Sequence, residues 1–223
     1  MRLSTMRLPA ATPRHALLVC IALAGCAGTD KPSTIVPPQT VEMDAETLEK
    51  FQHEVEEYVE LRKKVLNKIP PITDQSTSEE ITVHQDALTQ AIVKYRKGEK
   101  QGNFFKPAVE AAIRRTLTAE FTGPNGPALT QSIQQGNPKV EGNPTAGNPT
   151  EEVKETVKVA VNAVYNQAAP FSSVPSGLLL KLPPLPEEVR YRFVGRTLIL
   201  RDADANVILD FLPDVVPDHS VPK

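Results

Sequence analysis

The sequence predicts an α+β fold in which a small bundle of three or four helices packs with a C-terminal antiparallel β-hairpin or three-stranded sheet. Apolar residues recur every three or four positions between 44 and 121, which is the period of amphipathic helices. Apolar and basic residues alternate from Val189 to Val194, which is the period of a half-buried strand. A Gly/Pro-rich stretch separates the two patterns, so helices come first and strands last.

We expect three helices, at about 44–69, 78–97 and 105–121. Asp44 is a suitable N-cap for the first helix, Pro70-Pro71 ends it, and Gly98 is a C-terminal stop for the second. The expected apolar stripes are Leu48, Phe51, Val55, Tyr58, Leu61 and Val65 in the first helix, Ile81, His84, Leu88, Ala91, Ile92 and Tyr95 in the second, and Val109, Ala112, Ile113, Leu117 and Phe121 in the third.

Residues 123–150 read as a linker. The triplet Gly-Asn-Pro occurs in it three times, at 136–138, 142–144 and 147–149, although 128–134 can form one helical turn. The following segment, 151–166, has two possible interpretations: a fourth helix, or a strand over 158–165. Its valine content favours extended structure late and helix early.

The last part of the chain gives the clearest β pattern. Strands are expected at 189–194, 197–201 and 207–212, with Gly195-Arg196 and an Asp/Asn-rich stretch as the two turns. Before them, the proline-rich segment 169–186 is irregular apart from a short helical turn at Leu178–Leu180. The predicted divisions are 1–25 (signal), 26–43 (tether), 44–122 (helical), 123–150 (linker), 151–217 (C-terminal part) and 218–223 (tail).

The N-terminus has the three parts of an export signal. Arg2, Arg7 and Arg14 form a positive region without acidic residues, and the apolar run 16–24 follows. That run is too short for a permanent membrane span, which needs about 20 residues. Leu23-Ala24-Gly25-Cys26 comes next, and then a tether rich in Thr, Pro and Ser. The plainer alternative is an ordinary signal peptide cut near Ala24 or Ala27.

The order of these parts resembles the signal and lipobox of a bacterial lipoprotein. The resemblance implies that Cys26 becomes the first residue of the mature chain and carries acyl chains such as palmitate. Two or more chains anchor a protein stably. Ala27, rather than Asp, follows the cysteine, and by the same resemblance this implies the outer membrane. A lipoprotein of the cell membrane is the alternative.

Composition excludes several classes of function. Without the signal's three arginines, the chain has 22 basic and 27 acidic residues, and this net charge of −5 offers no nucleic-acid surface. Cys20 leaves with the signal, so Cys26 is the last thiol, and cysteine nucleophiles, disulfides and zinc–cysteine sites are excluded. No Trp is present to build a carbohydrate-stacking platform. We expect no cofactor.

Two clusters resemble metal sites. Asp202-x-Asp204-x-Asn206 matches the first ligands of a calcium loop, but Val207 and Pro213 replace the required Gly and Glu, which favours a hairpin turn. Glu49, His53 and Glu57 recur every four residues on one helix, but the strict zinc pattern is absent, which favours a solvated charged face. We therefore expect no metal site.

The remaining motifs are weaker. His84 lies at the edge of an apolar stripe and is expected to pack there. Ser220-x-x-Lys223 matches a penicillin-binding motif, but it lies in the tail rather than at the start of a helix. The run 182–186, Leu-Pro-Pro-Leu-Pro, is similar to a proline-rich ligand, although a stiff lead into the first strand is the simpler interpretation.

Residues 182–210 resemble the C-terminal signature of exported bacterial proteins known only as hypothetical. Its pattern is LPPLPxxxxYRFVGRxLxLRDxxANxIxD. The helical segment around Ala112–Leu117 is weakly similar as well. This family implies no activity, so no functional residue follows from it.

The sequence therefore predicts a lipid-anchored envelope protein of binding or structural type, with the membrane and a further envelope protein as partners. It contains no evident catalytic motif. The alternative is an envelope hydrolase or lyase whose site would draw on Asp202, Asp204, Asp210 and His84.

Replacing the lipidated cysteine tests the anchor directly. Cys26→Ser should remove the acyl chains and release the chain from the membrane fraction, because the remaining sequence has no permanent span. Fractionation and intact mass measure both effects. Cys20→Ser is the matched control and should leave both unchanged. A Cys26→Ser chain that stays membrane-bound with unchanged mass modification would contradict the prediction.

Overall fold

The computed structural model describes residues 43–135, 137, 139–140, 156–165, 169, 172 and 174–218. The predicted signal, the tether and the lipidation site Cys26 lie outside the described residues, as does the tail from 219 onward.

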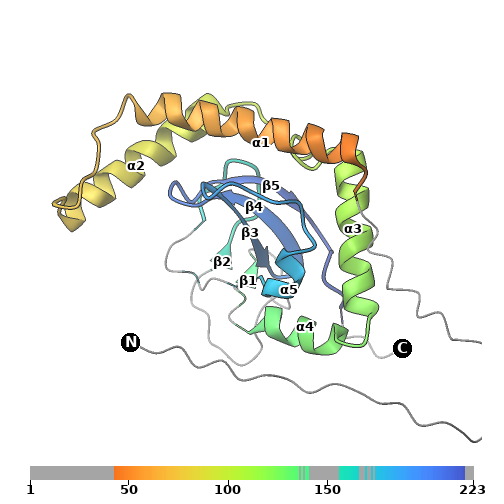
Figure 1. Ribbon diagram of the computed structural model, residues 1–223. Helices are drawn as coiled ribbons and strands as arrows, with labels where there is room; N and C mark the ends of the chain where they lie inside the picture. The colour runs from red at the N-terminus through yellow and green to blue at the C-terminus, as the bar shows by residue number, and fades with distance from the viewer. Residues whose placement is uncertain are drawn as a thin grey trace, which may run out of the picture. The chain divides into compact units, whose positions relative to one another are not determined.

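Four helices surround the sheet: α1 (Ala45–Leu66), α2 (Ser78–Tyr95), α3 (Pro107–Thr122) and α4 (Gly126–Gln134) (Figure 1). The predicted N-cap is confirmed, since the carboxylate of Asp44 accepts a hydrogen bond of 2.8 Å from the Thr47 amide. A capping box of Thr77 and Glu80 starts α2. None of the described helices combines the length and the apolar character needed to cross a bilayer.

The apolar stripe of α2 is shorter than predicted. His84, Leu88 and Ile92 are buried, but Ile81 and Tyr95 are 38% and 52% exposed. The first turns of α2 extend past the rest of the domain (Figure 1), so their apolar side chains have nothing to pack against. The stripes of α1 and α3 are largely confirmed, with the buried residues Phe51, Val55, Tyr58 and Val65 in α1 and Val109, Ala112, Ile113, Leu117 and Phe121 in α3.

The predicted linker starts too early, because α4 occupies nine residues of it. Thr130 and Ile133 on this helix are buried. A glycine is required at its start, since a Cβ on Gly126 would lie 1.9 Å from the carbonyl oxygen of Phe121. The tight turn between α3 and α4 therefore depends on a glycine that composition alone assigns to a loop.

The predicted antiparallel sheet is confirmed. Strands β3 (Val189–Val194), β4 (Thr197–Asp202) and β5 (Ile208–Leu212) pair in the order β3-β4-β5. Gly195, with φ of 58°, has the conformation that a tight hairpin turn needs at its first central position. A bulge between Leu200 and Arg201 places Asp210 opposite Leu200, on the same face of the sheet.

The core lies mainly on the face of the sheet that the helices cover. Tyr191, Phe193, Leu198 and Leu200 belong to one apolar cluster with residues of all four helices, including Phe51, Leu88, Leu117 and Ile133. A smaller cluster lies on the other face, where Val157, Tyr165 and Ala169 pack against Val194, Ile199 and Ile208. The sheet is thus buried on both sides of its centre.

Residues 151–155, where the sequence favours helix, lie outside the described residues. The described part, 156–165, contains no helix: β2 (Thr156–Val157) pairs in parallel with β1 (Lys139–Val140), and Val164 forms a bridge with Val207. The valine-rich segment is extended because it lines the second face of the sheet, where β-branched side chains pack well.

Both edges of the sheet are covered. The amide of Asn162 donates to Ile208 O at 2.8 Å, which begins a short pairing along β5. Along β3, the side chain of Asn137 bonds both backbone groups of Gly195, at 2.7 and 2.8 Å. The hydroxyl of Ser172 bonds both backbone groups of Phe193. These contacts satisfy groups that would otherwise invite another strand.

Asp210 joins the sheet to the loop between α2 and α3. Its side chain is completely buried and accepts hydrogen bonds from the amides of Gly102, Phe104 and Phe105 at 2.9–3.0 Å. Gly102 has φ of 89°, a conformation that suits glycine. The carboxylate therefore fixes the loop that positions α3.

Asp210→Asn should lower the free energy of unfolding by about 3 kcal/mol, because it weakens charge-assisted hydrogen bonds and turns an N–H group toward backbone donors. Urea denaturation measures the change. Asp74→Asn, in an exposed turn, is the control and should cost less than about 0.5 kcal/mol. Equal costs for the two substitutions would contradict the role of Asp210.

Candidate functional site

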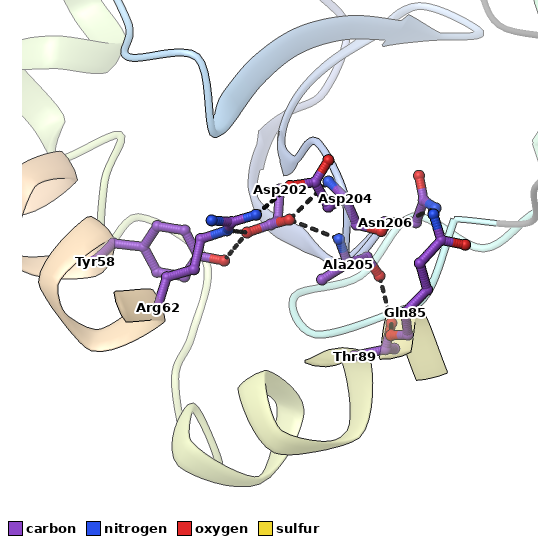
Figure 2. A network of polar contacts seen from close by, with 8 residues as sticks. All are labelled: Tyr58, Arg62, Gln85, Thr89, Asp202, Asp204, Ala205 and Asn206. Carbon is purple, nitrogen blue, oxygen red and sulfur yellow. Dashed lines mark hydrogen bonds and ion pairs between the residues drawn. The ribbon is translucent and has the colours of Figure 1, made fainter. Parts of the chain in front are cut away.

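The turn after β4 is organised by Asp202. This fully buried carboxylate accepts hydrogen bonds from the Tyr58 hydroxyl at 2.6 Å and from Arg62 Nε at 3.0 Å, both on α1 (Figure 2). It also accepts bonds from the amides of Asp204 and Ala205. Four donors on one carboxylate neutralise the cost of its burial.

The same turn also contacts α2. The hydroxyl of Thr89 lies 2.7 Å from Ala205 O and 2.8 Å from Gln85 O, within its own helix (Figure 2). The guanidinium of Arg62 forms a second ion pair with Asp204. Two helices and the β4–β5 turn therefore meet in one polar network on an otherwise apolar face.

The hairpin-turn interpretation of Asp202–Asn206 is confirmed by these contacts. The carboxylate of Asp202 binds the backbone two and three residues ahead, and Asn206 adopts the left-handed conformation, with φ of 55°. No group of three acidic, His or Cys side chains in the described part of the chain is arranged to hold a metal ion.

The residues of the enzyme alternative do not converge. Asp202 and Asp210 are used in separate structural networks. His84 and Asp204 do line one hollow of about 390 Å³, together with Arg62 and Ile72. Within it, His84 Nδ1 lies 2.7 Å from Pro70 O, and Asp204 is paired with Arg62. His84 is 8% exposed, as expected for the edge of a core.

The helical His–Glu cluster lies in solvent. His53 Nε2 is 3.5 Å from Glu57 Oε1, and their side chains are 65% and 64% exposed. Glu49 on the same helix is exposed as well. This is the solvated charged face that the sequence favours.

Arg96 is a buried cation that sequence reasoning missed. It is 5% exposed and lies over the rings of Tyr58 and Phe104, at 5.6 and 5.3 Å from their centroids. It donates to Leu209 O at 2.9 Å and to Asn162 Oδ1 at 3.1 Å. Burial lowers the pKa of its guanidinium. Its position just after the last apolar residue of α2 gave no signal of burial.

Two apolar hollows lie on either side of residues 179–184, which we call the leucine–proline ridge. The first has a volume of about 580 Å³ and lies between the ridge, the start of α1 and the middle of α3. The second has a volume of about 500 Å³ and lies between the ridge and β3. Leu180, Leu182, Pro183 and Pro184 line both hollows.

The ridge shows what Leu182–Pro186 does. Leu182 is 5% exposed, and Tyr191 donates from its hydroxyl to Pro183 O at 3.2 Å. The segment is packed on its own domain and leads into β3, as the simpler interpretation predicts. The short helix α5 (Ser176–Leu179) precedes it and buries Leu178, but Leu179 and Leu180 are 47% and 87% exposed.

Two arginines line the second hollow. Arg190 and Arg192 lie on β3, and neither forms an ion pair with a carboxylate of the residues that the structure describes. Arg192 donates from Nη1 to Tyr191 O at 3.0 Å, whereas its buried Nε has no hydrogen-bond partner. Burial, and then the charge of Arg190, lowers the pKa of Arg192. The alternating pattern predicted that Arg190 and Arg192 lie on a strand. It did not predict that the guanidinium of Arg192 is partly buried.

Comparison of this chain with family models, curated proteins and solved structures gives no match.

The four tyrosines should titrate in two groups. A hydrogen bond from Lys68, and then its charge, lowers the pKa of Tyr95. Burial raises the pKa of Tyr165 to about 12 and that of Tyr191 further, and burial and Asp202 raise that of Tyr58. A raised folded-state pKa stabilises the fold fully below the ordinary value of about 10, and this stability is lost as the pH rises above it.

Tyrosinate absorbance should therefore show one group ionising below pH 10 and three ionising only with alkaline unfolding. Without Trp, the signal belongs to tyrosine alone. Tyr95→Phe should remove the early step, and Tyr58→Phe should preserve it. A single step of four tyrosines near pH 10 would contradict the buried network.

Proposed function

We propose that this chain is a lipid-anchored cell-envelope protein of binding or accessory type, held at the membrane by acyl chains on Cys26. The observation that carries the proposal is the order of the N-terminal parts: arginines, a short apolar run, Leu23-Ala24-Gly25-Cys26 and a polar tether. Ala27 favours the outer membrane as the destination, with the cell membrane as the alternative.

The position of the first helix supports this arrangement. Sixteen residues, 27–42, separate the anchor cysteine from Met43, and α1 begins directly afterwards with its Asp44 cap. Such a tether would keep a folded domain next to the bilayer without embedding it.

The polar residues support binding rather than chemistry. Asp202 and Asp210 are completely buried, and their oxygens face hydroxyl, guanidinium and amide donors instead of open space. The alternative of a hydrolase or lyase would need the hollow that contains His84 and Asp204. There His84 is bonded to a backbone carbonyl, and it has no carboxylate within hydrogen-bonding distance.

The apolar surface supports binding directly. The two hollows beside the leucine–proline ridge have the size of ordinary ligand or peptide sites. The signature at 182–210 contains the proline part of the ridge, all of β3 and β4 and the start of β5. The exported proteins that share this signature would therefore share these strands and the prolines beside them.

Crosslinking in intact membranes tests the proposal. The native chain should crosslink reproducibly to a small set of envelope proteins, and Cys26→Ser should lose these adducts because the domain leaves the membrane. Mass spectrometry of the affinity-purified adducts identifies the partners. Cys20→Ser, altered in the signal only, should keep them.

Two outcomes would contradict the proposal. Identical adducts from the native and Cys26→Ser chains would show that the anchor does not determine the partners. Turnover of envelope material by the purified chain, abolished by His84→Ala with the fold intact, would favour the enzyme alternative.

A further inference from the structure

The leucine–proline ridge exposes apolar side chains at its start. Leu178 is 2% exposed and fixes α5 to the core, whereas Leu179 and Leu180 are 47% and 87% exposed. Single exposed leucines are common, but these two are adjacent, and Leu180 continues into two apolar hollows. The apolar surface is therefore continuous over the ridge.

Positive charge without a counter-ion lies beside it. Lys181 on the ridge is paired with Glu120 at 2.5 Å, but Arg190 and Arg192 have no such partner among the described residues. Glu187 and Glu188 precede them in sequence but line neither hollow. A half-buried guanidinium with an unbonded Nε is stabilised by an anion. The net charge of −5, counted without the signal's three arginines, conceals this local excess of positive charge.

The chain enters the domain at the same face. Met43 and Asp44, the first described residues, line the first hollow together with Leu180. If Cys26 carries the lipid, only the 16 residues 27–42 separate the anchor from Met43, so the anchored chain joins the domain at this face. Exposed leucines flanked by arginines are a pattern that proteins use at membrane interfaces.

We infer that the leucine–proline ridge docks on the anionic lipid surface of the membrane that holds the Cys26 anchor. Leu179 and Leu180 enter the interface, and Arg190 and Arg192 bind lipid phosphates. The inference rests on the proposed anchor and adds a fixed orientation to it. Docking gives the two uncompensated arginines an anion and removes the leucines from water.

A tryptophan at the ridge tests this, because the chain has none of its own. Leu180→Trp in the full lipidated protein should be quenched by brominated lipid in phosphatidylglycerol vesicles, and less in phosphatidylcholine vesicles. Val83→Trp is the matched control: Val83 is 61% exposed on α2 and lines neither hollow, so it should be little quenched. Adding Arg190→Gln and Arg192→Gln to Leu180→Trp should lower the docking equilibrium about fivefold per charge removed.

The outcomes separate the anchor from the docking. A lipidated Leu180→Trp chain that sediments with vesicles but is quenched no more than Val83→Trp overturns the docking and leaves the anchor intact. Equal quenching with and without the arginine substitutions overturns their role. A purified chain without lipid on Cys26 overturns both proposals. Crosslinks from the ridge to an envelope protein, without lipid quenching, assign the face to a protein partner instead.

Discussion

The fold depends on two buried aspartates on the helix-facing side of the sheet. Asp202 binds Tyr58 and Arg62 from α1, and Asp210 binds three amides of the loop between α2 and α3. The surrounding core is apolar, so its contacts are non-directional. The carboxylates supply direction, since each accepts bonds only from donors placed at specific points of the helical layer.

This constraint also accounts for where the acidic side chains of the β region point. Asp202 and Asp210 accept their hydrogen bonds from donors inside the domain. Arg96 is a buried cation in the same interior, where two aromatic faces and a backbone carbonyl surround its guanidinium. These buried polar groups stabilise the packing of the helices on the sheet.

The periodic patterns in the sequence predicted the helices and strands that depend on local sequence. The strands expected at 189–194 and 197–201 follow from alternation, and the N-cap at Asp44 follows from capping chemistry. What these patterns missed depends on tertiary packing. Ile81 belongs to the stripe of α2, but the first turns of that helix extend past the rest of the domain. Arg192 is partly buried because the ridge lies beside it.

The closure of the β3 edge has a consequence for how the chain tolerates change in length. Asn137, which bonds both backbone groups of Gly195, is the central residue of the first Gly-Asn-Pro triplet. The triplets at 142–144 and 147–149 repeat that unit later in the sequence, outside the described residues. Gain or loss of a downstream copy would alter the spacing to residue 156 while leaving the asparagine at the strand edge in place. Expansion of this repeat is therefore a change that evolution can make without exposing the sheet.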